Sequence, residues 1–312
     1  MIDRYNRWCL FYDCELVSSP REGPAYLLHQ LIDPLLRRVR EGLSKKLLDR
    51  DSRIVRISEA ETGDVRGHAC LKFVVTMGNQ RAADPSFVHF HLGTSRDADR
   101  RENEVKGGSA HCLLRLTPTA GHPTRHLLMI EQTTGLGRTT IERLLNSEFE
   151  AIATGRGDNF TSPVSGRPIS VRPIVHLSGH KSEQMEEALR TGTFAPIELI
   201  DTTPDPTWDE QGKFRLKRRI MRVDLVAPPG ERREALEVLS ARARQEGYGR
   251  MRITWKAPGA QRGNESEIDT DLADVGEALF SKRKLIFVEA GMSECSHTLR
   301  RDFIDAMAAE FG

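Results

Sequence analysis

The sequence has no long apolar run and no leader-like start, and these absences exclude two classes of protein. No apolar stretch approaches the roughly 18 residues that a membrane-spanning helix needs. The opening residues, MIDRYNRWCLFYDCEL, are too polar for a signal peptide. Aromatic residues make up only 6% of the 312 positions, while charged residues reach 29%. We therefore expect a soluble, cytoplasmic protein.

Cysteine is scarce, and its spacing is uninformative. The five cysteines are an odd number, and no two of them have C-x-x-C spacing. A disulfide framework and a tetrahedral zinc site are therefore not expected, and we interpret the thiols as reduced.

The first half of the chain has the pattern of short strands with one clear helix. Enrichment in Val, Ile, Phe and Leu predicts strands at 7–17, 53–61, 68–77, 86–92, 110–117 and 125–132. The pattern of 26–42 predicts a helix that Pro34 breaks or kinks. The charged, aperiodic stretch 94–109 is expected to be an exposed loop. We place a strand-rich α+β domain over residues 1–155.

A stretch rich in Gly, Pro, Ser and Asp, 156–168, has the composition of a linker. After it, strands and helices are expected in the order β-α-β-β-α-β, at 169–177, 182–190, 194–201, 213–226, 229–246 and 249–257. That order is the ferredoxin-like arrangement. The predicted fold class is α+β: a strand-rich N-terminal domain, then a ferredoxin-like βαββαβ C-terminal domain, 169–312, with a helical tail.

The segment IEQTTGLGRTTIERLL, 130–145, has the outline of a phosphate loop. A Walker A loop would need glycine where Gln132 stands and lysine where Arg138 stands. Thr139 and Glu142 have the spacing of a helix capping box. We therefore predict a structural strand-turn-helix; the alternative is that Arg138 and the helix N-terminus hold a phosphate.

Catalytic signals are weak. Glu104-Val105-Lys106, with Asp97 and Asp99 upstream, is the obvious match to the carboxylate and lysine set of a metal-dependent nuclease, but no buried strand surrounds it. Two expected strands carry possible metal ligands. His89 and His91 point to the same face of one strand, and His111 and Cys112 are neighbours on the other. Their spacing matches no ligand motif. We expect no enzyme activity and no cofactor.

Positive charge is concentrated in one segment, although the whole chain carries only +1. Between Lys213 and Lys256, 13 basic residues stand against five acidic ones, an excess of eight, so the other 268 residues sum to −7. Such asymmetry favours a polyanion-binding surface. Two alternatives stay open. One is a solvated surface whose helix arginines are neutralised by nearby glutamates, and the other is an acidic protein partner.

Alternation along KFRLKRRIMRVDLVAP and RMRITWK predicts strand cations on one outward ridge, without acidic partners of their own. Exposed aromatic residues are few there, which favours contact with a duplex backbone over base stacking. The predicted DNA-binding residues are Lys213, Arg215, Lys217, Arg218, Arg219, Arg222, Arg232, Arg233, Arg250, Arg252 and Lys256.

Residues 120–311 resemble the RexA-like phage exclusion proteins. The resemblance rests on HLLMIEQTTGLGRTTIERLL, SGRPISVRPIV, LRTGTFAPIELI, RRIMRVDLVAPPGERREALEVLS and YGRMRITWKAPGAQRGNESEIDT, followed by a tail similar to LRRDFIDAMAAEF. It implies a homodimer that binds double-stranded DNA without sequence preference in anti-phage defence, with a membrane protein as effector partner. The alternative function is a metal-dependent nuclease or toxin effector of a defence system.

Overall fold

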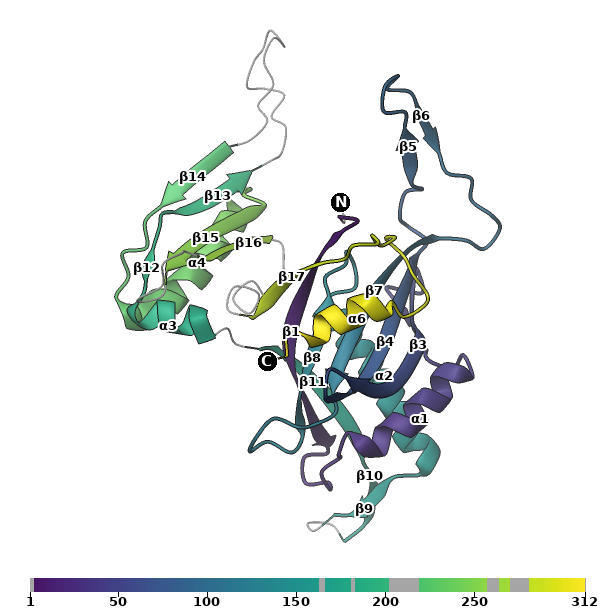
Figure 1. Ribbon diagram of the computed structural model, residues 1–312. Coiled ribbons are helices and arrows are strands. Elements are labelled where there is room, and N and C mark those ends of the chain that lie inside the picture. The colour runs from purple at the N-terminus through teal and green to yellow at the C-terminus, as the bar shows by residue number, and fades with distance from the viewer. Residues whose placement is uncertain are drawn as a thin grey trace. The chain divides into compact units, whose positions relative to one another are not determined.

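The chain forms two compact units, whose elements are labelled in Figure 1. The computed structural model describes residues 3–162, 166–180, 183–201, 219–256, 264–269 and 281–311. Unit 1 comprises Met1–Ser178 and Arg283–Gly312, and unit 2 comprises Gly179–Lys282. These boundaries differ from the expected ones, because the stretch 156–168 lies within unit 1 and the C-terminal tail returns to it. The α+β class is confirmed, since both units combine strands with helices.

Unit 1 is built on one large sheet with the strand order β11-β1-β8-β7-β4-β3-β2, and β17 also pairs with β1. Its strands are β1 (Asn6–Ser19), β2 (Lys45–Leu48), β3 (Arg53–Val65), β4 (His68–Asn79), β7 (Lys106–Arg115), β8 (Arg125–Glu131), β11 (Arg172–Gly179) and β17 (Arg283–Phe287). The predicted strands at 7–17, 53–61 and 68–77 are thus confirmed as parts of β1, β3 and β4.

The central strands of this sheet are covered on both faces. In β8, Leu127 and Met129 join one buried cluster, while Leu128 and Ile130 join another. Successive side chains of a strand point to opposite faces, so an unbroken apolar run marks a strand with a core on each side.

Helices α1 (His29–Arg40) and α2 (Arg138–Arg156) contribute to the cluster that contains Leu128 and Ile130. The predicted apolar stripe of α2 is confirmed, since Ile141, Leu144 and Phe149 are buried in it. Pro34 lies inside α1, so the expected break is wrong, while the alternative, a kink, stays a prediction.

Helix α6 (Arg301–Ala308) contributes to the cluster on the opposite face. Phe303, Ile304 and Met307 of this helix pack there together with Ile286 of β17. This apolar tail explains why residues 283–311 belong to unit 1.

Two short hairpins extend unit 1. One is formed by β5 (Ser86–Val88) and β6 (Ser95–Asp97), and the other by β9 (Asn159–Thr161) and β10 (Pro168–Ser170). The expected exposed loop 94–109 is mostly exposed, but Gly108 and Ser109 at its end are buried as part of β7.

Unit 2 contains a second antiparallel sheet. Its elements are α3 (Glu183–Thr191), β12 (Thr193–Phe194), β13 (Ile197–Asp201), β14 (Arg219–Val223), a 3-10 turn η1 (Pro229–Glu231), α4 (Arg232–Gln245), β15 (Arg250–Lys256) and β16 (Asn264–Asp269). Strand β13 lies between β14 and β15, and β16 also pairs with β15.

The core of unit 2 lies between this sheet and its helices. Met185 of α3 and Leu236 of α4 pack with Leu199, Met251 and Ile253 of the strands. The ferredoxin-like order is not confirmed, because the strand expected to begin it, 169–177, is mostly β11 and pairs with β1 in unit 1. The local pattern predicted that 169–177 forms a strand, but it did not indicate that this strand pairs with β1.

Candidate nucleic-acid interface

Four of the predicted DNA-binding cations share one face of the sheet in unit 2. In β15 the burial alternates residue by residue, with Met251, Ile253 and Trp255 buried on the helix side. The side chains between them therefore point the other way. We call this surface the outer face; its basic residues are Arg222, Arg250, Arg252 and Lys256.

A carboxylate sits in the middle of the outer face. Glu198 of β13 lies in register with Arg222 on one side and with Arg252 on the other. Its Oε1 is 3.0 Å from Nη2 of Arg222, and its Oε2 is 3.2 Å from Nη1 of Arg252. The Arg222 side chain is 71% exposed, so a ligand from solvent can reach it.

The prediction that strand cations lack acidic partners is therefore wrong. Spacing along the sequence indicates acidic partners within one helix, but Glu198 meets its arginines across neighbouring strands. The alternation of Ile197, Glu198 and Leu199 does place this carboxylate on the polar side of its strand. Knowing which cations it meets requires the strand order, which the sequence does not state. By register, Arg250 and Arg252 also lie opposite Asp269 and Glu267 of β16.

Three other predicted residues do not join the outer face. Arg219 lies three positions before Arg222 on β14, hence on the opposite side, where it contacts Asp201 at 3.5 Å and its guanidinium lies 4.9 Å from the Tyr248 ring centroid. Arg232 and Arg233 belong to α4. The single ridge expected for all of these residues is thus divided between two sides of unit 2.

Arg232 has a structural role. Its Nη1 donates to the main-chain oxygens of Leu189 at 3.2 Å and Gly192 at 3.0 Å, at the C-terminal end of α3. Arg233 instead forms a surface ion pair with Glu237, one helical turn later. The remaining predicted cations, Lys213, Arg215, Lys217 and Arg218, lie outside the described residues.

The turn before α2 serves packing. Arg138 donates from Nη1 to the main-chain oxygen of Leu177 at 2.8 Å, and Glu142 accepts from the Leu177 N–H. The predicted capping box is wrong, because Gly137 is the N-cap residue and no side chain caps it. These contacts hold α2 against β11, so Arg138 and Glu142 have structural roles here.

The candidate nuclease and metal residues are not brought together. Glu104 accepts from the N–H of Arg101 within an exposed loop. His89 and His91 lie at the end of the β5–β6 hairpin, whereas His111 is buried in the sheet. Within the described ranges, no three His, Cys, Asp or Glu side chains are arranged to hold a metal ion.

His111 belongs to a buried polar network that the sequence did not indicate. Its Nδ1 lies 2.8 Å from Oε2 of Glu131, whose Oε1 lies 3.4 Å from Nη1 of Arg7. Arg7 also donates to the main-chain oxygens of Met292 and Ser293, and His111 Nε2 accepts from the N–H of Arg300. Because these groups join β1, β7 and β8 to the returning tail, the network holds that tail on the sheet.

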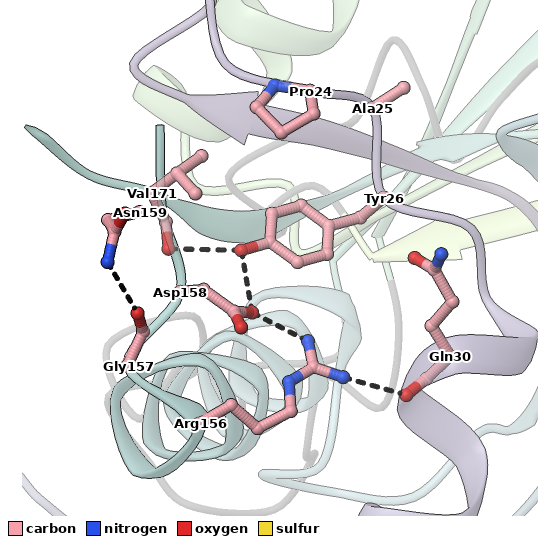
Figure 2. A pocket seen from close by; sticks show the side chains of 9 residues that line it. All are labelled: Pro24, Ala25, Tyr26, Gln30, Arg156, Gly157, Asp158, Asn159 and Val171. Atoms are coloured by element: carbon pink, nitrogen blue, oxygen red, sulfur yellow. Dashed lines mark hydrogen bonds and ion pairs between the residues drawn. The ribbon is translucent and has the colours of Figure 1, made fainter. Parts of the chain in front are cut away.

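A hollow of about 550 Å³ lies beside the ends of α1 and α2, and Figure 2 shows its lining. The hydroxyl of Tyr26 donates to Asp158 at 2.9 Å and lies 3.0 Å from the main-chain oxygen of Val171. Arg156 bridges Asp158 and the main-chain oxygen of Gln30. Burial and the neighbouring Asp158 raise the pKa of Tyr26 to about 12. These polar groups satisfy one another, as structural groups do.

Comparison with known proteins returned no match. No family model matches the chain, and no curated protein or solved structure is significantly similar to it. Among the residues that the structure describes, no helix has both the length and the apolar character needed to cross a membrane.

Proposed function

We propose that this chain binds double-stranded DNA without sequence preference through the outer face of unit 2. The observation that carries the proposal is the placement of Arg222, Arg250, Arg252 and Lys256 on one side of one sheet. A sheet holds its side chains at fixed spacing, so several phosphates can be neutralised without ordering a loop.

The binding energy would come from phosphate contact and the release of counterions. Arg222 and Arg252 are held by Glu198, while Arg250 and Lys256 are exposed beside them. Guanidinium groups suit this task because they keep their charge and present several donors to a phosphate. The resemblance of residues 120–311 to phage exclusion proteins supports a further part of the proposal. In it, a homodimer doubles the cationic surface, acts in anti-phage defence and signals to a membrane-protein effector.

The test removes two cations from the outer face and keeps the pairs of Glu198 with Arg222 and Arg252. We expect Arg250→Ala combined with Lys256→Ala to weaken binding of a random-sequence duplex. The slope of log K against log salt should become shallower by about 1.8, or about 0.9 per lost contact. Fluorescence anisotropy at several salt concentrations measures both quantities.

The matched control removes two arginines from the helix side of the same unit. Arg242 and Arg244 lie in the last turn of α4, and both are exposed. Arg242→Ala combined with Arg244→Ala changes the net charge equally and should leave affinity and slope nearly unchanged. Equal losses in the two double variants would show that net charge, and not the outer face, governs binding, and the proposal would fail.

A further inference from the structure

The β5–β6 hairpin ends in a group of exposed apolar side chains. Residues 83–97 are all exposed, and the hairpin stands away from the large sheet of unit 1 (Figure 1). Phe90 is 92% exposed, Leu92 71%, Val88 66% and Phe87 55%. Single exposed apolar residues are ordinary, but four large ones within six positions mark a surface that is covered in use. We call Phe87, Val88, Phe90 and Leu92 the apolar tip.

The apolar tip has no single apolar face. Phe87 and Val88 are consecutive residues of β5, so their side chains point to opposite sides of the hairpin. Phe90 and Leu92 lie in the connecting turn, beyond the last strand pair, Val88 with Ser95. A groove on a protein or a gap between two base pairs would cover one side of such an element. A medium that surrounds the end of the hairpin would cover all four side chains.

The backbone of the tip is suited to leaving water. The N–H of His89 donates to Thr94 at 2.8 Å, and the N–H of Gly93 donates to His89 at 2.9 Å. The N–H groups of His91 and Leu92 both donate to Nδ1 of His89, at 3.3 and 3.2 Å. Four N–H groups of the turn are thus satisfied within the hairpin itself, as insertion into an apolar phase requires.

Charged residues are absent from the end of the β5–β6 hairpin and frequent at its base, the distribution expected of an element that enters a lipid layer. No Asp, Glu, Lys or Arg occurs between Asp84 and Arg96, whereas Asp97, Asp99, Arg100, Arg101, Glu102 and Glu104 follow directly. An uncharged end followed by a charged base matches acyl chains followed by headgroups. A wedge for duplex DNA would instead need an excess of cations beside its apolar end, whereas the four acidic residues at 97–104 outnumber the three arginines at 96–101.

We propose that the apolar tip inserts into the surface of a lipid bilayer and attaches the protein there as a peripheral, non-spanning element. Phe90 and Leu92 enter deepest because they lie at the turn. Arg96, whose guanidinium lies 4.9 Å from the centroid of the Phe87 ring, sits at the level of the headgroups. This attachment is independent of DNA binding by unit 2.

The experiment is flotation of the full chain with phosphatidylcholine vesicles, which carry no net charge. The wild-type protein is expected to float with the vesicles at low and at high salt. Phe90→Ser combined with Leu92→Ser should reduce the bound fraction at least about tenfold. The control is Leu47→Ser combined with Val238→Ser, which removes two exposed apolar side chains elsewhere and should float like wild type.

A second measurement reports on the tip directly. Tryptophan in Phe90→Trp should gain blue-shifted emission on adding vesicles and should be quenched by brominated acyl chains, relative to wild type. Failure of the wild type to float, or equal loss in the control variant, would overturn the proposal. So would binding that requires anionic lipid and disappears with salt, which would assign it to surface cations. If the tip variant instead lost duplex binding or self-association, DNA or a second protein would be the occupant.

Discussion

The guanidinium of Arg156 donates from Nη1 to the main-chain oxygen of Gln30, at 3.1 Å. Gln30 lies four residues before Pro34 in α1, and proline has no N–H to offer that oxygen. Arg156, from the last turn of α2, therefore replaces the helical hydrogen bond that Pro34 removes. This is how α1 continues through a residue that was expected to break or kink it.

Replacing Arg156 with alanine should lower the free energy of unfolding by about 1 kcal/mol, since its side chain is partly exposed. Pro34→Ala restores an N–H four residues after Gln30, so the same replacement should cost less in that background. A double-mutant cycle in urea, followed by circular dichroism, measures the difference. Equal costs in the two backgrounds would mean that Arg156 acts through Asp158 alone.

The buried network around Glu131 makes a second prediction. Glu131→Gln keeps the shape of the side chain but leaves Arg7, which is 2% exposed, without a carboxylate. Breaking a buried ion pair by removing one partner costs about 3–5 kcal/mol of unfolding free energy. Urea denaturation should show a loss of that size.

A surface pair provides the comparison for Glu131. Glu15 pairs with Arg125 at 3.3 Å, and both side chains are substantially exposed. Glu15→Gln should cost no more than about 1 kcal/mol. If Glu131→Gln were as mild, the network would not be what holds the tail on the sheet.

Local pattern predicted most elements of this fold but not their partners. The stripe of Ile141, Leu144 and Phe149 identified α2, and runs of β-branched and aromatic residues identified the strands of unit 1. The local sequence pattern does not indicate that β11 pairs with β1 and not with the strands of unit 2. Nor does the pattern of Phe303 and Ile304 say that the tail covers the far face of the first sheet. Those pairings depend on contacts between residues far apart in sequence.

For the candidate site too, the sequence predicted which face of a strand a residue lies on, but not which residues of other strands it meets. Period-two alternation correctly separated Arg250, Arg252 and Lys256 from Met251, Ile253 and Trp255. The separation of Arg219 from Arg222 also follows from their odd spacing. The pairing of Glu198 with two arginines does not, because it requires β13 to lie between β14 and β15.

Tyr26 gives the stability of unit 1 a dependence on alkaline pH. In the folded chain burial and Asp158 raise the pKa of Tyr26 to about 12, whereas an unfolded tyrosine titrates near about pH 10. The folded state thus holds its phenolic proton more tightly. The resulting stabilisation is fully present below about pH 10 and is lost as the pH rises through about 12.

The difference in unfolding free energy between wild type and Tyr26→Phe should therefore shrink over that interval. Urea titrations of both proteins at successive alkaline pH values measure it, and the other tyrosines and lysines cancel in the difference. In the same interval, the tyrosinate absorbance of the wild type should contain a late step that the variant lacks. A difference that stayed constant with pH would mean that Tyr26 titrates normally.

Glu198 controls how much of the outer face is available to phosphate. It accepts from Nε of Arg222 at 3.1 Å and pairs with Arg252 at 3.2 Å, so DNA must compete with this carboxylate for both guanidinium groups. Glu198→Gln keeps the size of the side chain and one oxygen acceptor but removes the charge. We expect tighter binding of a random duplex and a salt slope steeper by up to about 1.8, because the charge that competes with phosphates for two arginines is removed.

Glu237→Gln is the matched control, since Glu237 pairs with Arg233 on α4, away from the outer face. It changes the net charge by the same amount and should leave the salt slope as in wild type. Anisotropy titrations of both variants separate a local effect from a general gain in positive charge. Weaker binding by Glu198→Gln would show that the carboxylate orients the two arginines more than it competes for them. Glu198 would then favour DNA binding by orienting Arg222 and Arg252, and would not oppose it by competing with phosphate.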